Sequence, residues 1–165
     1  MMAKMTVTGL DEFSTKIYAI ENGALKAVHK ALYAGADVLA DSLRESITAL
    51  PAISDYEAMG NYKKGTIGQI TYKQRDGLLN SMGIAPHKDT GGAAETKIGF
   101  DGYNEVITKR WPNGQPNAMI ARSVESGTSF MRKTPFVASA VRRSKERAQN
   151  AMSKAFDEEI NKLGG

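Results

Sequence analysis

Apolar residues recur every three or four positions along two long stretches of the chain, the spacing of one face of an α-helix. The first stretch runs from Ala24 to about Ala49, and its apolar face holds Leu25, Val28, Leu32, Ala36, Leu39, Leu43 and Ile47. A shorter segment from Leu10 to Ile20 has the same spacing, and Asn22-Gly23 predicts a break between the two. Pro51 predicts where the long helix ends, because a proline disfavours helical backbone in the residue before it.

The second long helix is predicted from Pro135 to Leu163. Pro135 suits the first turn of a helix, and Thr134 is expected to cap it. The apolar face of this helix holds Phe136, Val137, Val141, Ala148, Met152, Phe156, Ile160 and Leu163. A short helix is predicted for residues 72–82, while residues 118–125 fit either a short helix or a strand.

Three strands are predicted between the helices, at Gly83–His87, Glu95–Phe100 and Asn104–Arg110. Residues 89–92, Asp-Thr-Gly-Gly, separate the first two, and Asp101-Gly102 predicts a hairpin between the last two. Apolar and polar residues alternate in the second strand, as expected for an antiparallel strand with one buried face. Both long helices are expected to pack on one face of this sheet.

Residues 51–70 have neither the helical nor the strand period and contain three glycines and a proline. They predict a long, flexible, irregular loop that partners order, since unstructured loops of this length are usually functional or flexible. At 165 residues the chain is long enough for one sizeable core. The prediction is therefore a single α+β domain over residues 1–165, with two long helices packed on a small antiparallel sheet.

Composition excludes several classes of site. The chain has no cysteine, which excludes disulfides, thiolate catalysis and cysteine-ligated metals. It has neither a signal-peptide pattern nor a run of about 18 apolar residues, so synthesis in the cytoplasm and no membrane contact are expected. The net charge of +4 is uneven, because residues 1–104 sum to −1 and residues 105–150 to +6. A basic segment can attract nucleic acid or an acidic protein surface.

Catalytic and metal-binding patterns do not emerge from the sequence. The two histidines, His29 and His87, stand in no metal-binding motif, and they are interpreted as a packing residue and a surface residue. Residues 89–92 lack the Gly-Lys-Ser/Thr that would complete a phosphate-binding loop, and no serine has the setting of a nucleophile elbow. The expectation is a protein that is not an enzyme and has no cofactor.

Several short patterns, in this order of elements, resemble the neck and tail-component family of siphophages, to which minor tail protein Z is related. Gly9-Leu10-Asp11-Glu12-Phe13 leads into a long alanine-rich helix, and residues 77–82, Gly-Leu-Leu-Asn-Ser-Met, precede the sheet. Residues 125–128, Glu-Ser-Gly-Thr, are followed by Thr134-Pro135-Phe136-Val137 and the basic helix. Ser126 stands where the family tends to have an aromatic residue, and Asp76 where threonine is usual before the glycine.

The resemblance implies a virion structural protein of a tailed phage or prophage, a ring-forming subunit that completes the tail and joins it to the head. Its partners would be further copies in a six-fold ring, neighbouring head-closure or connector proteins, and tail-terminator or tail-tube proteins. DNA passing through the ring would make non-specific contacts. The protein would be found in the bacterial host cytoplasm during assembly and then in the neck of the virion. The alternative is a small basic nucleic-acid-binding module.

The candidate interface residues combine apolar and charged side chains. Arg143 and Arg147 share one face of the last helix, where they would line a ring channel or meet an acidic neighbour, or would simply be solvated. Glu125 is interpreted as part of a turn or of an interface salt bridge, and Gly127 suits a positive φ. The remaining candidates are Tyr56, Tyr62, Trp111, Met119 and Met131.

Overall fold

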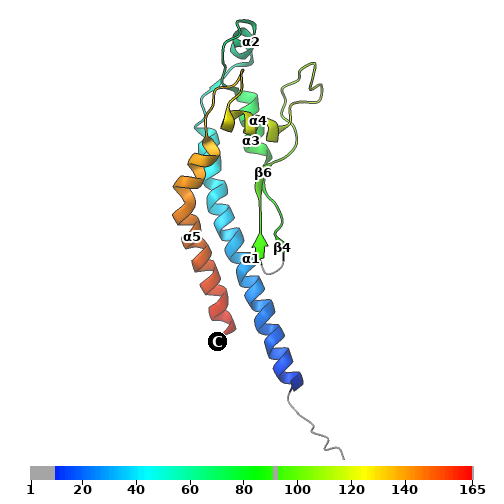
Figure 1. Cartoon of the computed structure of the whole chain (residues 1–165), viewed down its shortest axis with the longest axis vertical. Coiled ribbons are helices and arrows are strands. Elements are labelled where there is room, and N and C mark those ends of the chain that lie inside the picture. Colours follow the sequence, from blue (N-terminus) through cyan, green and yellow to red (C-terminus); the bar gives the residue numbers. More distant parts are fainter. Residues whose placement is uncertain (1–9, 91–92, 165) are drawn as a thin grey trace, which may run out of the picture.

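The computed structural model describes the backbone of residues 10–90 and 93–164, and its fold class is α+β, as predicted. The helices are α1 (Leu10–Thr48), α2 (Asp55–Lys63), α3 (Tyr72–Ser81), α4 (Asn117–Ser126) and α5 (Phe136–Leu163). The strands are β1 (Ala52–Ile53), β2 (Ile70–Thr71), β3 (Met82–Ile84), β4 (Lys88–Thr90), β5 (Ala93–Glu95) and β6 (Ile98–Phe100). Figure 1 shows an elongated molecule: α1 and α5 run side by side as a stalk, and α2, α3 and α4 form a head at one end.

Small residues let α1 and α5 approach each other closely along the stalk. Ala27, Ala31 and Ala40 of α1 are buried. A Cβ atom added to Gly35 would lie 2.5 Å from Cγ of Met152, so this glycine makes room for a side chain of α5. The predicted long helices therefore pack mainly on each other, and α5 reaches the sheet where Phe136 packs against Phe100 at 6.2 Å between ring centroids.

The predicted break at Asn22-Gly23 is wrong, because α1 continues through both residues. A Cβ atom at Gly23 would lie 2.5 Å from Cδ2 of Leu163. A glycine inside a helix costs about 1 kcal/mol relative to alanine. Here the space that it leaves accommodates the end of α5, a reason for glycine that only the packing reveals.

The apolar faces of the two long helices are buried over only part of their length. Leu43 and Ile47 are buried under the head, whereas Leu25 and Val28 are exposed. Phe156 of α5, expected in the core, is also exposed, as is Val141. Two paired helices can cover only a narrow strip of each other, so the wider apolar face predicted from the sequence stays uncovered beyond the head.

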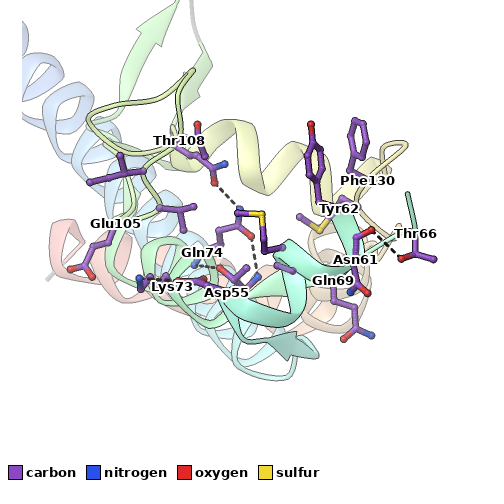
Figure 2. A pocket seen from close by; sticks show the side chains of 18 of the residues that line it. Asp55, Asn61, Tyr62, Thr66, Gln69, Lys73, Gln74, Glu105, Thr108 and Phe130 are labelled. Atoms are coloured by element: carbon purple, nitrogen blue, oxygen red, sulfur yellow. Dashed lines mark hydrogen bonds and ion pairs between the residues drawn. The ribbon is translucent and has the colours of Figure 1, made fainter. Parts of the chain in front are cut away.

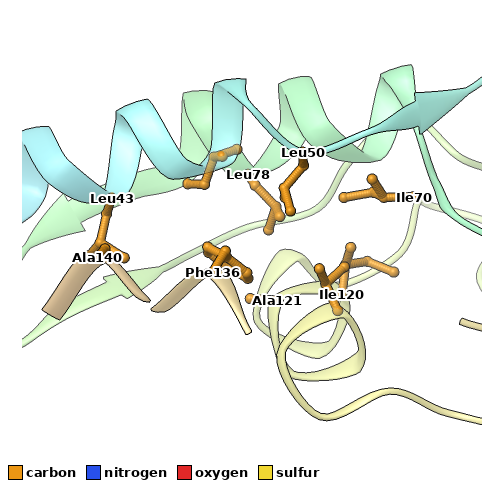
Figure 3. Close-up of a cluster of buried hydrophobic side chains, with 10 residues drawn as sticks. Leu43, Leu50, Ile70, Leu78, Ile120, Ala121, Phe136 and Ala140 are labelled. Atoms are coloured by element: carbon orange, nitrogen blue, oxygen red, sulfur yellow. The ribbon is translucent and has the colours of Figure 1, made fainter. Parts of the chain in front are cut away.

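The core lies where the head meets the upper part of the stalk (Figure 3). It joins the end of α1 to α3, α4 and the first turns of α5. Its buried members are Leu43, Ile47, Leu50, Ile70, Leu78, Ile120, Ala121, Val124, Phe136 and Ala140. Burial of a leucine-sized side chain contributes about 1.5–3 kcal/mol, so this cluster is the main source of stability in the head.

The strands form three two-stranded pieces. β3 pairs antiparallel with β6, and β4 pairs antiparallel with β5, so the first two predicted strands, residues 83–87 and 95–100, overlap an antiparallel pair. The hairpin predicted at Asp101-Gly102 is wrong, because β6 pairs with β3 instead. The third predicted strand, residues 104–110, is wrong. Tyr103 instead forms an isolated bridge with Pro116, and the Asn104 side chain accepts hydrogen bonds from the backbone of Val106 and Gln115. These side-chain bonds engage backbone N–H groups that a strand would need for pairing, so the segment forms a loop.

The segment 51–70, predicted as irregular, contains two short strands and α2. β1 and β2 pair in parallel. Ser54 and Glu57 form a capping box, since each side chain bonds the other's backbone N–H and so satisfies the first turn of α2. The Ser-x-x-Glu pattern at residues 54–57 is the sequence signature of this cap. The flexibility of this segment stays a prediction.

Candidate functional site

An open groove of about 910 Å³ lies in the head of the molecule. One wall is α2 and the segment that follows it, another is the loop 105–109, and a third is the segment around Phe130 (Figure 2). α3 contributes Lys73 and Gln74. The groove is therefore built from segments far apart in the sequence.

Apolar side chains dominate the exposed part of the groove. Tyr62 and Phe130 are exposed at 66% and 59%, with 5.7 Å between their ring centroids, and Figure 2 shows the two rings next to each other. Met59 and Ile107 are also exposed. Exposed apolar patches around a concavity are common at the binding surfaces of proteins in general.

Backbone hydrogen bonds hold the wall that carries Phe130. The N–H of Gly68 donates to the carbonyl of Phe130 at 2.9 Å, and the N–H of Arg132 donates to the carbonyl of Gly68 at 2.9 Å. Thr128 Oγ1 accepts from the N–H groups of Phe130 and Met131. The exposed aromatic ring is thus carried by a well-bonded backbone, which limits the conformational freedom of this segment.

Polar groups line the opposite side of the groove. Lys73 Nζ lies 2.8 Å from Oδ2 of Asp55. The hydrogen bond and the charge of Asp55, with a further contribution from the Glu105 carboxylate, raise the pKa of Lys73. Gln74 Nε2 donates to Oε1 of Gln115 at 2.7 Å. A lysine with a raised pKa stays protonated, so Lys73 is suited to binding anionic or polar groups and not to proton abstraction.

The eight candidate interface residues are dispersed over the molecule. Tyr62 and Met131 line the groove. Tyr56, on α2, is 89% exposed but is not a lining residue. Trp111 is half-buried in the loop after β6, and its backbone N–H donates to the carbonyl oxygen of Thr108. Met119 is half-buried against the core.

The three charged candidates differ in their contacts. Glu125 accepts hydrogen bonds from the N–H groups of Val137 and Ala138 at 2.8 and 3.1 Å, and so caps the N-terminus of α5. The predicted cap, Thr134, is wrong: Pro135 holds the N-cap position and no side chain at that position caps the helix. Arg143 and Arg147 are both exposed on α5, and Arg143 also donates to Ser46 Oγ of α1 at 2.7 Å.

Two features were missed from the sequence. The groove residues Met59 and Phe130 lie outside the helices and strands that the sequence predicted, where isolated apolar residues carry no periodic signal. Ile107 lies in the segment wrongly predicted as the third strand. The second feature is a cluster of His29, His87 and Asp89, whose ligating atoms lie within 4.8 Å of one another. A local sequence motif could not indicate this cluster, because 60 residues separate His29 from Asp89.

Comparison with protein-family models, with curated proteins and with solved structures found no match to this chain. None of the helices in the described part of the chain combines the length and hydropathy that crossing a bilayer requires.

Proposed function

We propose that this chain is a non-enzymatic assembly subunit that works through its surfaces, a neck or tail-completion protein that joins head to tail in a tailed phage or prophage. The observation that carries the proposal is the groove in the head, with the exposed rings of Tyr62 and Phe130 at its edge. Aromatic residues in apolar depressions are the usual anchors of protein interfaces. A segment of a neighbouring subunit is the expected occupant.

The shape of the molecule supports the same proposal. A stalk of two paired helices carries apolar side chains that the described part of the chain leaves exposed, including Leu25, Val28 and Phe156. Further copies of the chain, or neighbouring proteins of the head–tail junction, would bury them. The resemblance to siphophage neck proteins adds the expected arrangement, a ring around the path of the DNA.

The charge of the last helix supports contacts inside such a ring. The basic residues exposed on α5 include Arg142, Arg143, Lys145 and Arg147. Arg143 is in addition bonded to α1. We therefore expect Arg147→Glu to leave the fold intact and to weaken contacts with DNA or an acidic neighbour. Arg143→Glu should in addition destabilise the α1–α5 pair, because its partner Ser46 is buried.

The proposal is tested on the untagged full-length chain by light scattering, native mass spectrometry and negative-stain electron microscopy, alone and with the products of neighbouring genes. We expect rings or stable complexes. Phe130→Ala should reduce their formation at least about tenfold, the loss typical of an interface anchor. Tyr56→Ala is the matched control, because Tyr56 is an exposed aromatic residue outside the groove. Circular dichroism confirms that both variants fold.

Two results would overturn the proposal. One is a monomer that forms no complex with any neighbouring head or tail protein. The other is a monomer or dimer that binds DNA with submicromolar affinity at physiological salt, which would favour the nucleic-acid-binding module instead.

A further inference from the structure

His29, His87 and Asp89 meet beside the stalk although they come from two distant parts of the chain. His29 lies on α1, His87 directly precedes β4, and Asp89 lies in β4. Nε2 of His29 is 2.9 Å from Oδ1 of Asp89, and the two imidazole rings stack with 3.7 Å between centroids. One ligating atom from each residue lies within 4.8 Å of the other two.

Tyr33 holds the ring of His87 in place. It follows His29 by one helical turn, so both side chains are on the same side of α1. The backbone N–H of His87 donates to the Tyr33 hydroxyl at 2.9 Å, and that hydroxyl lies 3.1 Å from Nδ1 of His87. Nδ1 is therefore engaged by Tyr33, and Nε2 is the nitrogen suited to coordination. Histidines that bind metals are commonly oriented in this way, by a hydrogen bond at the other ring nitrogen.

We propose that His29, His87 and Asp89 form a binding site for one divalent transition-metal ion of the zinc class. Two imidazole nitrogens and a carboxylate oxygen are a donor set that Zn²⁺ accepts, whereas Mg²⁺ and Ca²⁺ prefer oxygen donors alone. Tetrahedral zinc with bonds of about 2.0–2.1 Å places its ligands roughly 3.3 Å apart. The 2.9 Å pair must therefore open slightly. One ring nitrogen of His87 lies within 4.8 Å of both partners, so it must approach by no more than about 1.5 Å, and the stacked rings must turn so that both histidines face one ion.

The site would act as a clamp between the stalk and the β4–β5 hairpin. His29 is fixed by α1, while His87 and Asp89 belong to the hairpin, which β3 and β6 join to the head. Asp89 is half-exposed, so an ion can reach the site from solvent. Three protein ligands leave a fourth position on tetrahedral zinc for water or for a donor from another molecule. A bound ion would thus hold the hairpin against α1.

The test is a calorimetric titration of ZnCl₂ into the untagged, chelator-treated full-length chain. Zinc binding at other cysteine or histidine sites does not interfere, because the chain has no cysteine and only these two histidines. We expect one ion per chain, and an affinity at least about tenfold lower in His87→Gln and in Asp89→Asn. Tyr33→Phe tests the positioning role and should also weaken binding about tenfold. Asp37→Asn is the matched control, an exposed carboxylate further along α1, and should bind as the parent does.

Hydrogen exchange supplies a second, independent measurement. Zinc should slow hydrogen exchange in β4 and β5 of the parent chain and leave the exchange of the Asp89→Asn variant unchanged. Asp89 is exposed at the surface, so its replacement tests the site even if a histidine variant fails to fold. The proposal would be overturned if the parent chain bound zinc no more tightly than the double variant H29Q/H87Q does. It would also be overturned if the parent chain bound Mg²⁺ as tightly as Zn²⁺. Either result would leave the three residues as a polar contact between helix and hairpin.

Discussion

Replacing Glu125 with alanine should destabilise the whole domain, because this carboxylate caps the N-terminus of α5. In the folded protein it accepts two backbone N–H groups, those of Val137 and Ala138, at 2.8 and 3.1 Å. Pro135 at the N-cap position provides no side-chain acceptor. Loss of the carboxylate would leave both donors without this partner at the positive end of the helix dipole.

The magnitude follows from the two hydrogen bonds. Loss of a capping side chain costs about 0.5–2 kcal/mol, and the charge of Glu125 places it in the upper half of that range. We therefore expect a decrease of about 1–2 kcal/mol in the free energy of unfolding. In a domain of this size each kcal/mol corresponds to a shift of about 2–4 °C in Tm.

Denaturant unfolding followed by circular dichroism measures this change. Glu125→Gln should lose less stability than Glu125→Ala, because the amide keeps one oxygen acceptor but has no charge. Glu146→Ala, an exposed glutamate on the same helix, is the control and should change stability by less than about 0.5 kcal/mol. Equal stability of Glu125→Ala and Glu146→Ala would refute the capping argument and restore an interface role for Glu125.

Three further predictions concern other parts of the domain. Gly127→Ala should cost about 1–3 kcal/mol, because Gly127 has φ of 75° and an added Cβ would lie 2.9 Å from Cβ of Lys133; an unchanged midpoint in urea would contradict this. Leu78→Ala, in the core of the head, should cost about 2–5 kcal/mol by the same measurement, and a cost below 1 kcal/mol would remove Leu78 from the core. Hydrogen bonds from Lys162 and Lys30 lower the pKa of Glu159 from 4.5 to about 2, so the stability that this carboxylate adds is present above about pH 4.5 and disappears as the pH falls towards 2. Glu159→Gln should flatten the decrease of Tm over this range, and parallel curves for variant and parent would count against the ion pair.

The local pattern of the sequence determined most of the secondary structure. The period of three to four residues predicted the long helix after Ala24 and the terminal helix up to Leu163, and both are present. The alternation of apolar and polar residues over 95–100 predicted an antiparallel strand there, and β6 pairs antiparallel with β3. Gly127, chosen for its sequence context, has the positive φ expected of it. The helical period and the glycine turn depend on residues close to one another in the chain, so the sequence alone could predict them.

Tertiary structure alone decided which of the predicted faces are buried. Phe136 and Phe156 lie on the same predicted apolar face, yet Phe136 is in the core and Phe156 is exposed, because the head covers only the first turns of α5. Gly23 signals a break in the sequence, but the end of α5 packs against it and the helix continues. Whether a helix face is buried depends on which element packs against it. The periodicity of the sequence does not identify that element.

The candidate sites depended on tertiary structure in the same way. Tyr62 is a candidate of the sequence as an exposed aromatic residue, whereas its neighbour Phe130, 68 positions later, is not. The isolated β-bridge between Gly68 and Met131 brings the two rings together. His29 and His87 were each assigned an ordinary role, because neither has a ligand nearby in sequence. The β4–β5 hairpin packs against α1 and so places the two histidines in contact. Their distance in space could not be deduced from their separation along the chain.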